Sequence, residues 1–222
     1  MKLMHCNIYS IPVGLYQLTN LTDLNFSNNH ISSLPPGIES LSSLLKISFY
    51  SNELTEVPPS LFSLTQLIEI DLYYNQLEII PDEVDQLSNL EVLFLSNNRL
   101  YKLPDRLGNL HSLKRLYVHH NRLAYLPGTF AGLNDLEVLH IHNNYFPDIP
   151  KVVFQMSQLQ ELDISFNDIR IIPEAIRDLK RLQYFFLYKN PLDEELEENQ
   201  HLRNTIAEIE GRGGIVKTSL DQ

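Results

Sequence analysis

The chain has 222 residues, of which 43% are hydrophobic, so it has enough apolar material for a sizeable core. It carries a formal net charge of −11, which makes it a poor match for the phosphate backbone of nucleic acids. Its one cysteine, Cys6, excludes a disulfide within the chain, and no apolar run approaches the length of a membrane span. We therefore expect no nucleic-acid partner and no membrane insertion.

Eight asparagines recur along the chain at one fixed interval, without an insertion, and the sequence numbers of successive members differ by 23 every time. These ladder asparagines are Asn29, Asn52, Asn75, Asn98, Asn121, Asn144, Asn167 and Asn190. Around the fourth of them the unit reads Leu90-x-x-Leu93-x-Leu95-x-x-Asn98-x-Leu100-x-x-Leu103-Pro104-x-x-Leu107-x-x-Leu110. A fixed period with this pattern of leucines and asparagine is typical of leucine-rich repeat proteins.

Each unit predicts one coil of an α/β solenoid. Leu93 and Leu95 alternate with outward positions, as in a half-buried strand of a parallel sheet on the concave face. Asn98 follows where the strand ends, and its amide can satisfy backbone groups that have lost their ladder partners. Pro104 ends the extended segment, and the leucines that follow at an interval of three predict a short helical or 3-10 turn on the convex face. Because one coil cannot bury its own apolar edges, the coils must stack.

The unbroken period indicates a single domain over residues 1–222. Residues 1–20 form a truncated first coil, in which Cys6 takes the ladder position one repeat before Asn29. Residues 21–192 hold seven full repeats and a final partial one. The open strand edge of the first coil leads us to expect a weak homodimer formed through residues 1–20.

The last segment, residues 193–222, does not continue the repeat and predicts a C-terminal helical cap. Asp193 can cap a helix that runs through about Glu210, followed by three glycines that end it. Beyond the glycines, Ile215 and Val216 can return to the last coil.

The uniform 23-residue unit, with Leu-Pro in mid-coil and few cysteines, resembles the leucine-rich repeat proteins of pathogenic leptospires. This resemblance implies a bacterial protein, secreted or on the cell surface, that attaches to a host protein of the cell surface or matrix through its concave face. Similar 23-residue units also occur in intracellular eukaryotic scaffolds of the Ras-suppressor type. The alternative is therefore a cytoplasmic scaffold or signalling adaptor.

The outward strand positions predict a binding surface, because equivalent residues of successive coils become lateral neighbours about 4.8 Å apart on a parallel sheet. These positions carry many aromatic and histidine residues, which are typical of protein–protein hot spots. Tyrosines also suit a strand surface for purely structural reasons, but phenylalanines have no polar group that would favour exposure. The predicted protein-binding residues are Tyr50, Tyr73, Phe94, Tyr117, His119, His140, His142, Asp163, Phe166 and Phe186.

Four of these residues also form a candidate metal site. His119 and His142 are lateral neighbours, His140 lies two residues before His142, and Asp163 is the lateral neighbour of His140. Imidazoles with a carboxylate suit zinc, although adjacent histidines are commonly no more than polar contact residues.

Motifs of catalysis are missing from the sequence. It has no P-loop, no His-Glu-x-x-His, no Rossmann glycine pattern and no nucleophile elbow. We predict a non-enzymatic protein-binding module that needs no cofactor, and a zinc-dependent binder or enzyme is the alternative.

Overall fold

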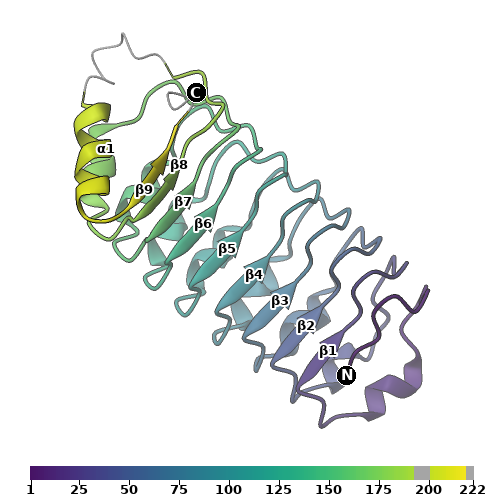
Figure 1. The fold of residues 1–222 in the computed structure, drawn as a ribbon. Coiled ribbons are helices and arrows are strands. Elements are labelled where there is room, and N and C mark those ends of the chain that lie inside the picture. The colour runs from purple at the N-terminus through teal and green to yellow at the C-terminus, as the bar shows by residue number, and fades with distance from the viewer. Residues whose placement is uncertain (193–200, 219–222) are drawn as a thin grey trace.

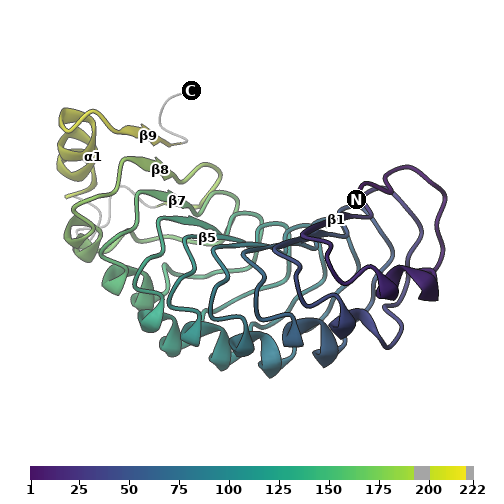
Figure 2. The ribbon, with the colours of Figure 1, turned by 90° about the horizontal axis from the view of Figure 1, so that it is seen from below.

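The computed structural model describes residues 1–192 and 201–218. In this part of the chain, the repeated coils stack into a curved solenoid (Figure 1). Its parallel sheet lines the inner side of the arc, and short 3-10 turns lie along the outer side (Figure 2). The predicted α/β solenoid is confirmed.

Each coil contributes one short strand, and neighbouring strands pair in parallel with an offset of one repeat from β1 to β8, so that Leu93 lies opposite Leu116. The middle residue of each strand points into the core, and the residues that flank it face the concave side. The strands are β1 (Asp23–Asn25), β2 (Lys46–Ser48), β3 (Glu69–Asp71), β4 (Val92–Phe94), β5 (Arg115–Tyr117), β6 (Val138–His140), β7 (Glu161–Asp163), β8 (Tyr184–Phe186) and β9 (Ile215–Lys217).

The residue before each ladder asparagine adopts a left-handed backbone conformation. Asn97, for example, has a φ of 52°, and the equivalent residues of the other coils have φ values between 50° and 58°. This conformation turns the chain inward directly after the strand, which explains why the strands are so short.

The convex side consists of 3-10 helices, and seven of the eight that the described residues form begin directly after a proline at the N-cap. Proline fixes φ and has no N–H, so it ends the extended segment at the same point of each coil. In the second coil Gly37, with a φ of 111°, takes the N-cap position. The helices are η1 (Val13–Gln17), η2 (Ile38–Ser40), η3 (Pro59–Ser63), η4 (Asp82–Gln86), η5 (Asp105–Asn109), η6 (Gly128–Gly132), η7 (Lys151–Gln155) and η8 (Glu174–Asp178).

The ladder asparagines are buried, and each joins its own coil to the preceding one. Oδ1 of Asn121 accepts a hydrogen bond from the backbone N–H of Leu100 at 2.9 Å. Its Nδ2 donates to the carbonyls of Leu95 in the preceding coil and Val118 in its own, both at 3.0 Å. The same three bonds recur at both ends of the ladder, and the eight asparagines are only 5–9% exposed.

The N-terminal residues follow the same backbone path as the later coils. Lys2 forms a parallel bridge with Asn25, and η1 covers the outer side. The backbone N–H of Cys6 donates to Oδ1 of Asn29 at 3.0 Å, so the thiol occupies the ladder position of this coil, where it is exposed.

The C-terminal cap consists of helix α1 (Leu202–Gly211) and strand β9, which pairs with β8. The helix buries Leu202 and Ile209, and it ends where the backbone N–H of Gly214 donates to the carbonyl of Ile209. A Cβ atom on Gly214 would lie 2.5 Å from the carbonyl of Gln183, so this turn requires glycine. The predicted return of Ile215 to the last coil is confirmed.

The start of that helix was predicted at Asp193, which lies outside the described residues. Among the described residues, no helix combines the length and the apolar character that a bilayer span requires.

Asn121→Ala should lower the free energy of unfolding by about 1–3 kcal/mol, because the buried N–H of Leu100 loses its partner and the carbonyls of Leu95 and Val118 each lose one of two side-chain donors. Urea unfolding measures the change. The matched control is Asn134→Ala, which truncates an exposed asparagine and should have little effect. Equal stability of the two variants would contradict a structural role for the buried amide.

Candidate functional site

The centre of the concave face carries two pairs of parallel aromatic rings. Tyr50 and Tyr73 stack with their ring centroids 5.6 Å apart and 4° between the ring planes. Phe94 and Tyr117 stack at 4.8 Å and 7°. The rings are parallel because lateral neighbours on a parallel sheet project their side chains in the same direction.

These rings surround a hollow of about 370 Å³ on the open concave surface. Six of the ten residues that the sequence predicted for protein binding line this hollow, together with Asp71. The hollow is lined by Tyr50, Asp71, Tyr73, Phe94, Tyr117, His119 and His140.

Asp71 is the lining residue that is not among the ten predicted protein-binding residues. It sits at the end of β3, between Ser48 and Phe94 in the sheet. Its Oδ2 accepts a hydrogen bond from the hydroxyl of Ser48 at 2.9 Å, and its Oδ1 accepts from the backbone N–H of Tyr73 at 3.1 Å. Burial raises the pKa of the Asp71 carboxyl above its ordinary value, although both hydrogen bonds oppose this shift. Both oxygens are engaged, so the hollow presents mainly ring faces.

Two of the predicted residues lie elsewhere on the face. Phe166 is 48% exposed in the coil that contains β7, and Phe186 lies at the end of β8 beside Asp163. Neither lines the hollow. They add apolar surface towards the C-terminal end of the concave face.

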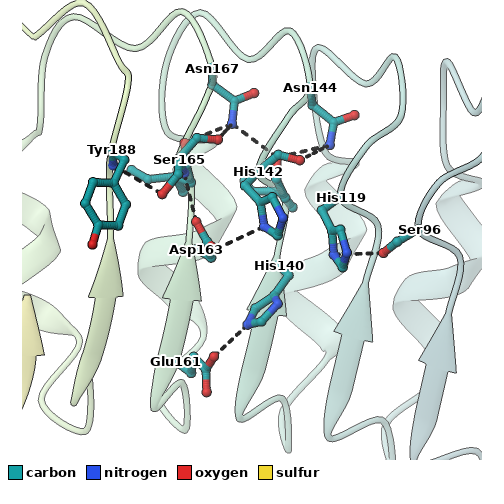
Figure 3. A network of polar contacts seen from close by, with 12 residues as sticks. Ser96, His119, His140, His142, Asn144, Glu161, Asp163, Ser165, Asn167 and Tyr188 are labelled. Carbon is teal, nitrogen blue, oxygen red and sulfur yellow. Dashed lines mark hydrogen bonds and ion pairs between the residues drawn. The ribbon is translucent and has the colours of Figure 1, made fainter. Parts of the chain in front are cut away.

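The predicted histidines come together on the concave face (Figure 3), and His119 and His140 also line the hollow. The rings of His119 and His142 stack with centroids 4.1 Å apart and 12° between their planes. The ring of His140 is tilted against both, at 5.9 Å and 5.8 Å. One ligand nitrogen of each ring lies within 4.8 Å of the corresponding nitrogens of the other two.

Each ring in this histidine cluster has a polar partner on a neighbouring coil. Nδ1 of His119 lies 2.8 Å from Oγ of Ser96, and Nε2 of His140 lies 2.7 Å from Oε1 of Glu161. Nδ1 of His142 lies 3.0 Å from Oδ2 of Asp163, an ion-pair distance without the alignment of an ideal hydrogen bond. The three partners therefore hold the three rings in place.

The carboxylate of Asp163 contacts a different histidine from the one that the sequence predicted. Asp163 is opposite His140 in the sheet register, as expected, but its carboxylate contacts His142. It does not belong to the group of three residues whose ligand atoms converge. Glu161, which is not among the predicted site residues, is the carboxylate that contacts His140.

The electrostatics of the cluster favour a neutral ring at its centre. Burial lowers the pKa of His119 to about 3, and the neighbouring His142, His140 and His120 contribute to this shift because their charges would repel a proton. Burial alone would raise the pKa of Asp163, but its contact with His142 and its bonds from Ser165 outweigh this effect and lower it.

Comparison with known families identifies the repeat. A model described as a leucine-rich repeat region matches residues 81–205, and two shorter leucine-rich repeat models match residues 42–100 and 20–41. The chain belongs to the leucine-rich repeat family. None of the curated proteins compared with it matches significantly by sequence.

Among solved structures, the chain resembles a leucine-rich repeat protein of Leptospira interrogans, with a TM-score of 0.71 and 24% identity over 94% of this chain and 63% of that one. At this identity the likeness concerns the fold alone. The predicted resemblance to the leptospiral leucine-rich repeat proteins is confirmed at that level.

Two plant receptors are also similar. The ectodomain of the Arabidopsis thaliana receptor kinase GASSHO1/SCHENGEN3, in complex with Casparian strip integrity factor 2, gives a TM-score of 0.76 and 32% identity over 87% of this chain and 24% of that one. The plant peptide hormone receptor RGFR1, in complex with RGF2, gives a TM-score of 0.74 and 30% identity over 82% of this chain and 31% of that one. The chain spans less than two thirds of each of these three structures.

The raised pKa of Asp71 predicts a pH-dependent effect of Asp71→Asn. The folded chain keeps the Asp71 proton at pH values where the unfolded chain, with a pKa near 3.8, has lost it. Asp71 therefore contributes a loss of stability as the pH rises through this window, and the asparagine variant lacks this contribution.

The free energy of unfolding of Asp71→Asn minus that of the wild type should accordingly increase between about pH 3 and pH 7. Urea unfolding at both pH values tests this, with the exposed Asp135→Asn as the control. A difference that stays constant, or falls, as the pH rises would contradict the effect of burial on Asp71.

Proposed function

We propose that this chain is a non-enzymatic protein-binding module that recognises its partner through the concave face. The observation that carries this proposal is the hollow walled by the Tyr50–Tyr73 and Phe94–Tyr117 stacks. Rigid aromatic rings on a concave surface offer a large contact area, and residues of this kind dominate the energy of protein interfaces.

The chemistry of the hollow selects for an apolar or aromatic side chain of the partner. Its walls are ring faces, and the carboxylate of Asp71 is already engaged by Ser48 and Tyr73. Most of the wall offers no hydrogen-bonding partner to a buried polar group, whereas an aromatic ring could pack between the stacks. A partner loop that projects one such side chain fits the curved surface.

The proposed partner is a protein of a host cell surface or matrix, and the proposed location is outside the bacterial cell or on its surface. This choice follows from the resemblance of the repeat motif to the leptospiral leucine-rich repeat proteins, and the structural likeness to the Leptospira interrogans protein concerns the fold alone. The similarity to a plant receptor-kinase ectodomain and to a plant peptide hormone receptor, both solved in complexes, supports an extracellular binding role in general. The competing proposal is a cytoplasmic scaffold that binds through another surface.

One such surface is a hollow of about 580 Å³ outside the concave face, beside the segments that precede η4 and η5. It is lined in part by Pro81, Lys102 and the 52% exposed Tyr125. Because charged residues and prolines form much of this wall, it offers less aromatic contact area than the concave hollow. It provides a matched control.

The test compares three immobilised proteins: the wild type, Phe94→Ala with Tyr117→Ala, and Tyr101→Ala with Tyr125→Ala. Tyr101 and Tyr125 are 51% and 52% exposed, and Tyr125 lines the second hollow. Each is exposed to a mammalian extracellular-matrix extract and, separately, to a cytosolic extract, and the captured proteins are identified by mass spectrometry. We expect matrix proteins that bind the wild type and the Tyr101→Ala, Tyr125→Ala variant but not the Phe94→Ala, Tyr117→Ala variant. Each lost hot-spot ring should weaken binding by about 2 kcal/mol or more.

Thermal unfolding of the same proteins shows whether the loss is specific to binding. The midpoint of the Phe94→Ala, Tyr117→Ala variant should stay close to that of the wild type, because both side chains lie on the surface and not in the core. Capture that survives in this variant, or that is lost only in the Tyr101→Ala, Tyr125→Ala variant, would refute recognition by the concave face. Capture from the cytosolic extract alone would favour the intracellular scaffold.

A further inference from the structure

We propose that His119, His140 and His142 together bind one zinc ion on the concave face. This site does not depend on the proposed function, since it concerns only what the three side chains bind. One ligand nitrogen of each residue lies within 4.8 Å of those of the other two. Zinc holds imidazole nitrogens at about 2.0–2.1 Å in a tetrahedral arrangement, so small side-chain movements bring the three atoms to ligand distance.

The polar partners of the rings leave one nitrogen of each ring available. A carboxylate only accepts hydrogen bonds, so Nε2 of His140 and Nδ1 of His142 carry the protons that face Glu161 and Asp163. Nδ1 of His140 and Nε2 of His142 then keep their lone pairs. For His119, Nδ1 can donate to Ser96, which leaves Nε2 as the ligand atom.

These partners are the kind of groups that orient zinc ligands in proteins. A metal-bound histidine usually donates its second ring N–H to a carboxylate or another acceptor, which fixes the tautomer and makes the ring a better ligand. Here Glu161 and Asp163 serve two of the rings and Ser96 serves the third. The carboxylates also place negative charge beside the position of the cation.

Binding requires the stacked rings to turn. The lone pair of an imidazole lies in the ring plane, and the planes of His119 and His142 are almost parallel. Rotation about the last side-chain torsion of histidine has broad minima, so the rings can tilt towards a common point. The hydroxyl of Tyr73, 3.3 Å from Nε2 of His119, must give way at the same time.

Three protein ligands leave the fourth zinc position open. Structural zinc sites usually have four protein ligands, whereas sites with three keep a place for water or another molecule. An ion held by the three histidines would lie beside the aromatic hollow, because His119 and His140 also line that hollow.

Calorimetric titration of the full chain with zinc chloride tests the proposal, after treatment with a chelator and dialysis into buffer at about pH 7.5. We expect one ion per chain. His142→Ala should weaken binding more than about 100-fold, and Asp163→Asn about 10- to 100-fold, as is usual for loss of an orienting carboxylate. His111→Ala, whose ring contacts the carbonyl of Gly132 away from the cluster, should bind zinc like the wild type.

Thermal unfolding without metal confirms that each variant is folded, and His140→Ala replaces His142→Ala if the latter is not. Cobalt provides a spectroscopic readout, because a tetrahedral cobalt site has strong visible absorption that should vanish in the same variants. The proposal would be overturned if the wild type gave no heat of binding. It would also be overturned if His142→Ala, or His140→Ala in its place, bound zinc with the same affinity as the wild type. An equal loss in His111→Ala would overturn it too, since the metal would then bind surface histidines in general.

Discussion

The structure depends on the buried amide at the end of each strand. Where the chain turns away from the sheet, backbone groups lose their ladder partners in the interior, where water cannot replace them. The asparagine side chain supplies both an acceptor and a donor, and it does so for two coils at once. Each coil is therefore hydrogen-bonded to the preceding one at the equivalent position of the repeat, which explains why the repeat spacing stays constant along the chain.

This fixed register separates the positions that build the fold from those that are free to carry function. Inward positions must be apolar and of similar size, since they fill one continuous core. The outward positions have no such constraint, and lateral neighbours there come from equivalent positions of successive repeats. Tyr117 thus lies between Phe94 and His140, although the three are far apart along the chain. The aromatic hollow and the histidine cluster both arise from this arrangement.

The same separation explains what the sequence could predict. The solenoid, the ladder and the lateral neighbours follow from the period alone, because they depend on the backbone. The side-chain pairings do not, since they depend on which torsion each residue adopts: Asp163 lies opposite His140 yet contacts His142, and Glu161 reaches His140 diagonally. The place of Asp71 in the hollow could not be predicted for a similar reason, since it depends on the burial of its side chain among the rings.

The left-handed residue before each ladder position limits the chemistry available at the rim of the concave face. Branching at Cβ makes a positive φ unfavourable, so valine, isoleucine and threonine are poorly suited to these positions, whereas asparagine tolerates them best. The chain obeys this restriction in every coil. Its rim can therefore be diversified with amides, imidazoles, aromatic rings and long cations, but hardly with branched aliphatic side chains. The residues that occupy it are His5, Asn28, Ser51, Tyr74, Asn97, His120, Asn143, Phe166 and Lys189.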